Sequence, residues 1–288
     1  GDRRADPRGR AGRKKMAWIT EEALYQKSTA SAATWGKGTV LIGSRTVKAG
    51  NFLELEIFPL VAVERGCWQE AKKQSREAQR RVNLRNAQKR LARLLNANFG
   101  PGDLLGHFTC AQGATEEQAR RQVKNFISRL RRRATKAGKK LKYVYVIETT
   151  GAEGRMKYHV HMTLNGGWID RDALEAAWGQ GLARVDRCKD QPGGLKGFAL
   201  YITQRKATQE KLLSRRWACS QNLRQPVVRT SYSRFRRRDM DKMAAEAADF
   251  SALAKKFPGY EIVERPEVKY SDYLPGAYIT VLLKRRGA

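Results

Sequence analysis

The fold of this protein is set around the stretch Lys157-Tyr158-His159-Val160-His161-Met162-Thr163-Leu164. β-Branched and aromatic residues dominate this stretch and a turn-forming Asn-Gly-Gly run follows it, which predicts a β-strand. Because successive side chains of a strand point to opposite faces, His159 and His161 share one face. The chain has 3 histidines in all, and two imidazoles on one face of a strand indicate a site for a divalent metal ion.

The sequence on either side of this strand predicts a mixed fold. We expect strands at 104–110, 143–148 and 182–185, and helices at 115–135, 170–178 and 195–206. Thr115 and Gln118 have the spacing of a capping box at the start of the first helix. A short polar loop joins the strand at 143–148 to the histidine strand, which favours a hairpin. The sequence therefore predicts an α+β fold, with a central antiparallel sheet of about five strands and helices packed on one face.

Composition divides the 288 residues into four parts. Residues 1–15 have the composition of a disordered basic arm. Residues 16–100 form an N-terminal extension with short strands and a long basic helix over 67–97, which suits either a solvated helix packed on one face or a helix lying along a nucleic-acid backbone. A turn-rich joint at 98–103 precedes the core at 101–210. Residues 211–288 form a mixed C-terminal extension, with a helix at 240–256 and strands at 261–268 and 277–283.

The charge of the chain points to a polyanionic partner. Lys and Arg number 58 against 28 Asp and Glu, which gives a formal net charge of +30. Nucleic acid is the first candidate, and an anionic membrane the second. No apolar run approaches the roughly 18–20 residues that span a bilayer, so we expect no membrane partner. Nucleic-acid contacts are predicted at exposed basic runs, namely Arg131, Arg132, Arg133, Lys139, Lys140, Arg236, Arg237 and Arg238.

The cysteines argue against a zinc site made of thiolates. None of the 4 cysteines, Cys67, Cys110, Cys188 and Cys219, forms a Cys-x-x-Cys pair. Their spacing is that of reduced thiols in an intracellular protein.

A metal held by His159 and His161 needs further ligands, and Glu148 is the best candidate. It ends an otherwise apolar and aromatic strand and precedes the loop to the histidine strand. If the two strands pair as a hairpin, Glu148 lies beside the histidines, provided that the register faces it correctly. Imidazole and carboxylate ligands suit Mn²⁺ or Mg²⁺ in phosphate chemistry, with zinc as the alternative. For His107, the third histidine, a structural role is favoured over a contact with the ligands or the substrate.

Tyr201 is the candidate nucleophile. The predicted helix at 195–206 has an apolar stripe, and Tyr201 lies near its edge. It is therefore either a half-buried core tyrosine or a hydroxyl aimed at the metal site, where it could attack a phosphodiester and form a phosphotyrosine. The metal would polarise the phosphate, and Lys206, Arg205 and Lys196 are cations that could assist the tyrosine.

This ordered set resembles the HUH endonucleases, and most closely the rolling-circle replication initiators of plasmids and small single-stranded DNA phages. His159-Val160-His161 matches the metal motif, Glu148 the carboxylate that often completes the ligand set, and Tyr201 the nucleophile. The first family strand motif is matched more loosely by Leu105-Gly106-His107-Phe108-Thr109-Cys110.

The sequence departs from the family pattern beside the tyrosine. Gln204 stands where many members carry a lysine, so Lys206 or Lys196 would substitute. Arg205 stands where some phage initiators carry a second tyrosine, which makes this a single-tyrosine sequence.

The resemblance implies metal-dependent nicking and joining of single-stranded DNA at a replication origin, in the cytoplasm of a bacterial host. Tyr201 would keep the 5′ phosphate while the free 3′ hydroxyl primes synthesis. The chain has no Gly-x4-Gly-Lys-Ser/Thr loop, so a host helicase is implied together with a polymerase. A single-tyrosine transposase or relaxase is an alternative with the same chemistry. A basic nucleic-acid-binding protein without catalysis is another, although it would not need the histidines, the carboxylate and the tyrosine together.

Overall fold

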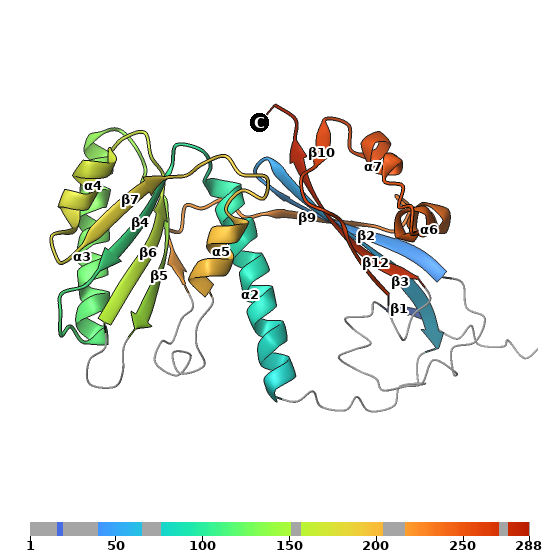
Figure 1. Ribbon diagram of the computed structural model, residues 1–288, viewed down its shortest axis with the longest axis horizontal. Coiled ribbons are helices and arrows are strands. Elements are labelled where there is room, and N and C mark those ends of the chain that lie inside the picture. Colours follow the sequence, from blue (N-terminus) through green and yellow to red (C-terminus); the bar gives the residue numbers. More distant parts are fainter. Residues whose placement is uncertain are drawn as a thin grey trace, which may run out of the picture.

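The computed structural model describes residues 16–19, 40–64, 76–150, 157–203, 217–270 and 276–287. Within these ranges two antiparallel sheets stand on either side of the long helix α2, Arg76–Asn98 (Figure 1). The smaller sheet carries the histidine strand, and the larger one is built from the two ends of the chain. None of the helices in the described ranges is both long enough and apolar enough to cross a bilayer.

The smaller sheet has 5 strands in the order β7-β4-β6-β5-β8. Their bounds are β4 Leu104–Thr109, β5 Tyr143–Thr150, β6 Lys157–Leu164, β7 Ala183–Arg187 and β8 Ala218–Cys219. Every pairing in this sheet is antiparallel, and β5 and β6 are neighbours joined as a hairpin. The prediction of an α+β fold around an antiparallel sheet of about five strands is confirmed.

Helices α3, Glu116–Lys136, and α4, Arg171–Trp178, cover one face of the smaller sheet. The predicted capping box at the start of α3 is present, with Thr115 and Gln118 each accepting from the backbone N–H of the other, at 3.2 and 2.8 Å. Phe126 of α3 and Trp178 of α4 pack edge to face, their ring centroids 5.0 Å apart. Both rings also contact Phe108 of β4, so the three rings form a fully buried core on this face of the sheet.

Helix α5, Lys196–Thr203, and the C-terminal half of α2 cover part of the opposite face. Leu95 of α2 and Ala199 of α5 are fully buried against Val144 and Val146 of β5. The prediction of helices on one face therefore accounts for only one of the two helical layers. The reason lies in β5, which is apolar on both faces, and a strand of that kind is buried on both sides. The second layer stops short of the β4–β6 end of this face, where the histidines lie.

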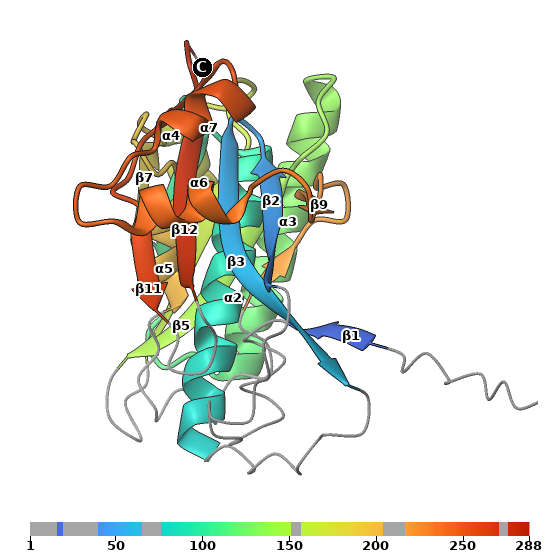
Figure 2. The ribbon, with the colours of Figure 1, turned by 90° about the vertical axis from the view of Figure 1, so that its right-hand side faces the viewer.

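The larger sheet joins the two extensions of the chain. Its 7 strands are β1 Met16–Ile19, β2 Val40–Ala49, β3 Phe52–Glu64, β9 Val227–Ser231, β10 Tyr260–Ile262, β11 Glu267–Tyr270 and β12 Ala277–Arg285. β12 pairs with β3, and β9 pairs with β2, so segments from opposite ends of the sequence are neighbours. Helices α6, Arg237–Ala244, and α7, Ser251–Lys256, lie across its outer face (Figure 2).

Two predicted elements of the C-terminal part are each divided in the structure. The helix expected at 240–256 is two short helices, because Asp249 bonds the backbone N–H of Ser251 at 2.8 Å and starts a new helix there. The strand expected at 261–268 is two strands, with Pro266 between them. Proline has no N–H to donate to a ladder, so a strand is interrupted where it falls.

Ion pairs attach α2 to the inner face of the larger sheet. Arg93 of α2 donates to Glu54 of β3 at 2.6 Å and to Glu56 at 3.3 Å, and Lys89 lies 3.4 Å from Glu56. Burial raises the pKa of Glu54, but the hydrogen bond and charge of Arg93 and the charge of Lys89 outweigh it and hold that pKa below its usual value. The pair therefore stabilises the fold at neutral pH, and this contribution is lost as the pH falls and the carboxylate is protonated.

Replacing Arg93 by Met should lower the free energy of unfolding by about 2 kcal/mol at pH 7, because Glu54 is then left largely buried with only Lys89 nearby. Urea denaturation of both proteins measures the difference, which should shrink as the pH is lowered through the titration of Glu54. Arg81→Met is the matched control, since the Arg81–Glu77 pair on the same helix is exposed and contributes little. Equal urea midpoints for Arg93→Met and the wild type would contradict this account of how α2 is held.

Candidate active site

The histidines of this chain meet on one face of the smaller sheet. In the β4–β6 register His107 stands opposite His161, and His159 stands opposite Thr109. The rings of His107 and His161 are stacked with centroids 4.7 Å apart and planes at 1°, and the ring of His159 lies 5.3 Å from that of His107. All 3 histidines of the sequence are therefore in one cluster.

Glu148 enters this cluster from β5. It stands opposite His159 in the β5–β6 register, and its Oε2 atom lies 3.0 Å from Nε2 of His161. The hydrogen bond to His161 is the main reason why the pKa of Glu148 is lowered, so the carboxylate is ionised at neutral pH. The hairpin and its register thus bring together the three side chains that the sequence selected as ligands, namely His159, His161 and Glu148.

His107 is the site residue that sequence reasoning placed elsewhere. A structural role was favoured for it, whereas its ring lies against both other imidazoles. Position 107 faces the cluster because β4 pairs with β6 in a register that puts it level with His161. That pairing joins segments about fifty residues apart, and the available signal was the loose match of the 105–110 segment to a family strand motif.

The imidazoles of the cluster are held neutral by their surroundings. Burial, followed by the neighbouring His161 and His159, lowers the pKa of His107, and burial lowers the pKa of His159 in spite of the carboxylate of Glu148. Nε2 of His159 lies 2.9 Å from the Thr150 hydroxyl, while its Nδ1 is buried with no partner among the described residues. A neutral imidazole with an unused ring nitrogen is the form that binds metal ions.

The donor types fit a divalent ion, although their present geometry is not that of a formed metal site. In the described ranges no three His, Cys, Asp or Glu side chains are already arranged around a common point. The cause is visible in the contacts, since Glu148 and His161 bond each other and the rings of His107 and His161 are stacked. The chemistry of the set still suits an ion, because it combines neutral imidazoles with an ionised carboxylate and leaves a buried ring nitrogen unpaired.

Tyr201 lies over this cluster. Ala199 and Ile202 anchor α5 in the core, and Tyr201 projects from the opposite side of that helix with 61% of its surface exposed. Its ring meets the ring of His161 edge on, with centroids 5.4 Å apart and planes at 89°. Tyr201 is therefore not a half-buried core residue, and its hydroxyl is open to a substrate that approaches the histidines.

The cations proposed to assist Tyr201 are placed less closely. Lys206 and Arg205 lie outside the described residues. Lys196, at the start of α5, forms an ion pair with Glu264 near the larger sheet. On the open part of the histidine face the nearest cation in register is Arg184 of β7, which stands opposite His107.

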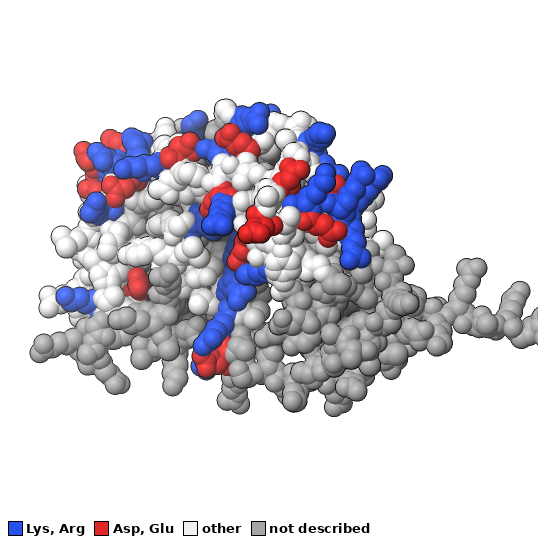
Figure 3. Space-filling view, turned by 45° about the vertical axis from the view of Figure 1, so that its right-hand side comes forward, with Lys and Arg blue, Asp and Glu red and all other residues white. Residues whose placement is uncertain are grey.

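The predicted nucleic-acid contacts are exposed but do not adjoin the cluster. Arg131, Arg132 and Arg133 lie on α3, and Lys139 and Lys140 follow it, on the far side of the sheet from the histidines. Arg236, Arg237 and Arg238 lie at the start of α6, over the larger sheet. Figure 3 shows another line of basic side chains along α2, whose N-terminal half exposes Arg80, Arg81 and Arg85.

Comparison with known protein families gives a match that covers the whole cluster. Residues 106–206 match the model of a family described as replication-associated proteins of the ORF2 type. This stretch is about a third of the chain, and it contains His107, Glu148, His159, His161 and Tyr201. No curated protein and no solved structure matches the chain. The match supports a replication-associated protein of the initiator type, which implies that it interacts with DNA.

Proposed function

We propose that this protein nicks and rejoins single-stranded DNA through a phosphotyrosine at Tyr201, in a metal-dependent reaction that initiates rolling-circle replication. The observation that carries the proposal is the position of Tyr201. An exposed tyrosine lies 5.4 Å, ring to ring, from His161 in a cluster of imidazoles and a carboxylate. The family match over 106–206 adds the connection to replication.

The metal would be held by His159, His161 and Glu148, with His107 beside them. Mn²⁺ or Mg²⁺ bound there would supply positive charge to the phosphate that is attacked. The carboxylate and the neutral imidazoles provide oxygen and nitrogen donors of the kind these ions take with phosphate substrates. The open part of the face, next to β7, leaves room for the DNA strand, and Arg184 provides a cation for its backbone.

Tyr201 performs the covalent step. Its hydroxyl oxygen bonds to phosphorus while the bond from phosphorus to the 3′ oxygen breaks, so the tyrosine keeps the 5′ phosphate. The tyrosyl proton passes to solvent or to a neutral imidazole, and the departing 3′ oxygen takes up a proton. The 3′ hydroxyl then primes synthesis by a host polymerase after a host helicase unwinds the duplex, and attack by a 3′ hydroxyl on the phosphotyrosine rejoins a strand.

The proposal is tested by incubating the protein with Mn²⁺ and a labelled, randomised single-stranded DNA pool, followed by denaturing electrophoresis. We expect a labelled protein band that resists denaturation and is absent when EDTA is present. DNA that is retained in a native gel but never attached to denatured protein would favour the non-catalytic nucleic-acid-binding protein instead.

His107 should contribute to metal affinity. Replacing it by Phe keeps a stacked ring but removes both nitrogens, and we expect Mn²⁺ to bind roughly 10-fold more weakly, as is typical when a group that supports a metal site is lost. Electron paramagnetic resonance titration of free Mn²⁺ measures this without DNA. Arg184→Gln is the control, because it alters the neighbouring position without removing a ligand and should not weaken binding. Unchanged Mn²⁺ affinity in His107→Phe would show that this ring has no part in the metal site.

A further inference from the structure

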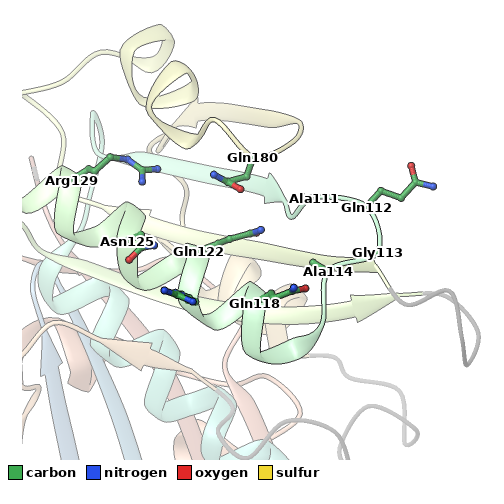
Figure 4. A pocket seen from close by; sticks show the side chains of 10 residues that line it. Ala111, Gln112, Gly113, Ala114, Gln118, Gln122, Asn125, Arg129 and Gln180 are labelled. Carbon is green, nitrogen blue, oxygen red and sulfur yellow. The ribbon is translucent and has the colours of Figure 1, made fainter.

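A polar pocket lies on the other face of the smaller sheet, at the same end as the active site. It has a volume of about 460 Å³ and is formed by the loop after β4, the first turns of α3 and the turn before β7 (Figure 4). Its polar lining consists of the amides Gln112, Gln118, Gln122, Asn125 and Gln180, together with Arg121. Thr109, the last residue of β4, joins the two sites, because it pairs with His159 and precedes the pocket loop.

The walls of this pocket are held by specific hydrogen bonds. Arg129, which also lines it, donates to the backbone oxygens of Ala177 and Trp178 at 2.9 and 3.2 Å and fixes the end of α4 against α3. The indole N–H of Trp178 donates to the backbone oxygen of Thr109 at 2.7 Å. Gly181 packs so closely that a Cβ there would lie 2.6 Å from that same oxygen. The turn that carries Gln180 is therefore a built wall.

One amide inside this pocket has an unused acceptor. Oε1 of Gln122 is buried and has no hydrogen-bond partner in the part of the chain that the structure describes. A buried acceptor without a partner destabilises a fold, so such groups are rare unless a ligand satisfies them. The missing partner is a hydrogen-bond donor that enters the pocket from outside the protein.

We propose that this pocket binds one unpaired nucleobase with an exocyclic amino group, adenine best, from the DNA strand that lies at Tyr201. Glutamine and asparagine amides present a donor and an acceptor side by side, which matches the edge of adenine, and the N6 amino group would satisfy Oε1 of Gln122. Thymine has no exocyclic amine and fits least well. The inference rests on the proposed function for the identity of the ligand, and Arg121 provides a cation for the adjoining phosphate.

The test selects binders from a fully randomised single-stranded DNA pool, using Tyr201→Phe protein so that no strand is cut, and sequences what is retained. We expect a preference for adenine at one position, at a fixed distance from the nicking point mapped with the active enzyme. Adding Gln122→Leu should reduce the preference at that position by roughly 10-fold and leave the other positions unchanged. Asn125→Leu should act in the same direction, because its amide lines the same pocket.

Gln221→Leu is the matched control, since Gln221 is an exposed amide outside the pocket and should leave the preference intact. Leucine at 122 removes an unsatisfied acceptor, so the thermal midpoint should be equal or higher. A pool without any base preference, or the same preference in Gln122→Leu, would overturn the inference. Absence of the covalent adduct in the active enzyme would refute the proposed function instead, and the binding selection would still report on the pocket.

Discussion

Tyr201→Phe should reduce covalent attachment of DNA by at least roughly 1,000-fold, because the variant lacks only the attacking oxygen. The ring stays in place over His161, and Ala199 and Ile202 still anchor the helix. Binding of single-stranded DNA should therefore change by less than about 2-fold, since an exposed hydroxyl contributes little to binding. The amount of labelled protein after denaturation measures the first effect, and fluorescence anisotropy with the same oligonucleotides measures the second.

Tyr232→Phe is the matched control for this experiment. Tyr232 is exposed to a similar degree, 59% against 61% for Tyr201, but it follows β9 in the larger sheet and does not touch the histidine cluster. Its removal should leave attachment unchanged. Normal attachment in Tyr201→Phe would exclude this residue as the nucleophile, and loss of attachment in both variants would indicate a general effect on folding or binding.

His161→Ala should reduce metal-dependent cleavage by roughly 100-fold or more, because the central ring of the cluster is lost. His161 is 4% exposed and contacts Glu148, His107 and Tyr201. The substitution removes a metal ligand of the proposed site and leaves the carboxylate of Glu148 without its hydrogen-bond partner. Cleavage rates over a range of Mn²⁺ concentrations should show a weaker dependence on the metal, and anisotropy should show that DNA still binds.

Thr163→Val is the control on the same face of the same strand. Thr163 is as buried as His161, and its hydroxyl has no partner among the described residues. Valine has nearly the same shape, so this variant should cleave normally and unfold at an equal or higher temperature. Wild-type cleavage in His161→Ala would mean that the metal site has been assigned to the wrong residues.

The features of the site that could be predicted from the sequence are those set by local geometry. Side chains two apart on a strand share a face, so His159 and His161 are neighbours wherever the strand lies. The short connection from β5 to β6 made a hairpin the natural pairing, and its register places Glu148 opposite His159. The helical stripe of α5 places Tyr201 away from the buried Ala199 and Ile202.

The features that sequence reasoning missed depend on contacts between distant segments. The role of His107 follows from the pairing of β4 with β6, which no local pattern encodes. The second helical layer follows from the packing of α2 and α5 on Val144 and Val146, which links the N-terminal part to the core. Basic runs predict contact with a polyanion, but not the face on which they lie, so the position of Arg131, Arg132 and Arg133 behind the sheet was not predictable.

The most direct test of the central claim is to locate the DNA on the protein. The adduct formed with Mn²⁺ is digested with trypsin and nuclease, and the modified peptide is identified by mass spectrometry. Cleavage after Lys196 and Arg205 releases residues 197–205, in which Tyr201 is the only tyrosine. We expect a nucleotide linked through its 5′ phosphate to Tyr201 in this peptide. A nucleotide on any other of the 10 tyrosines of the chain, or on no tyrosine at all, would contradict the account.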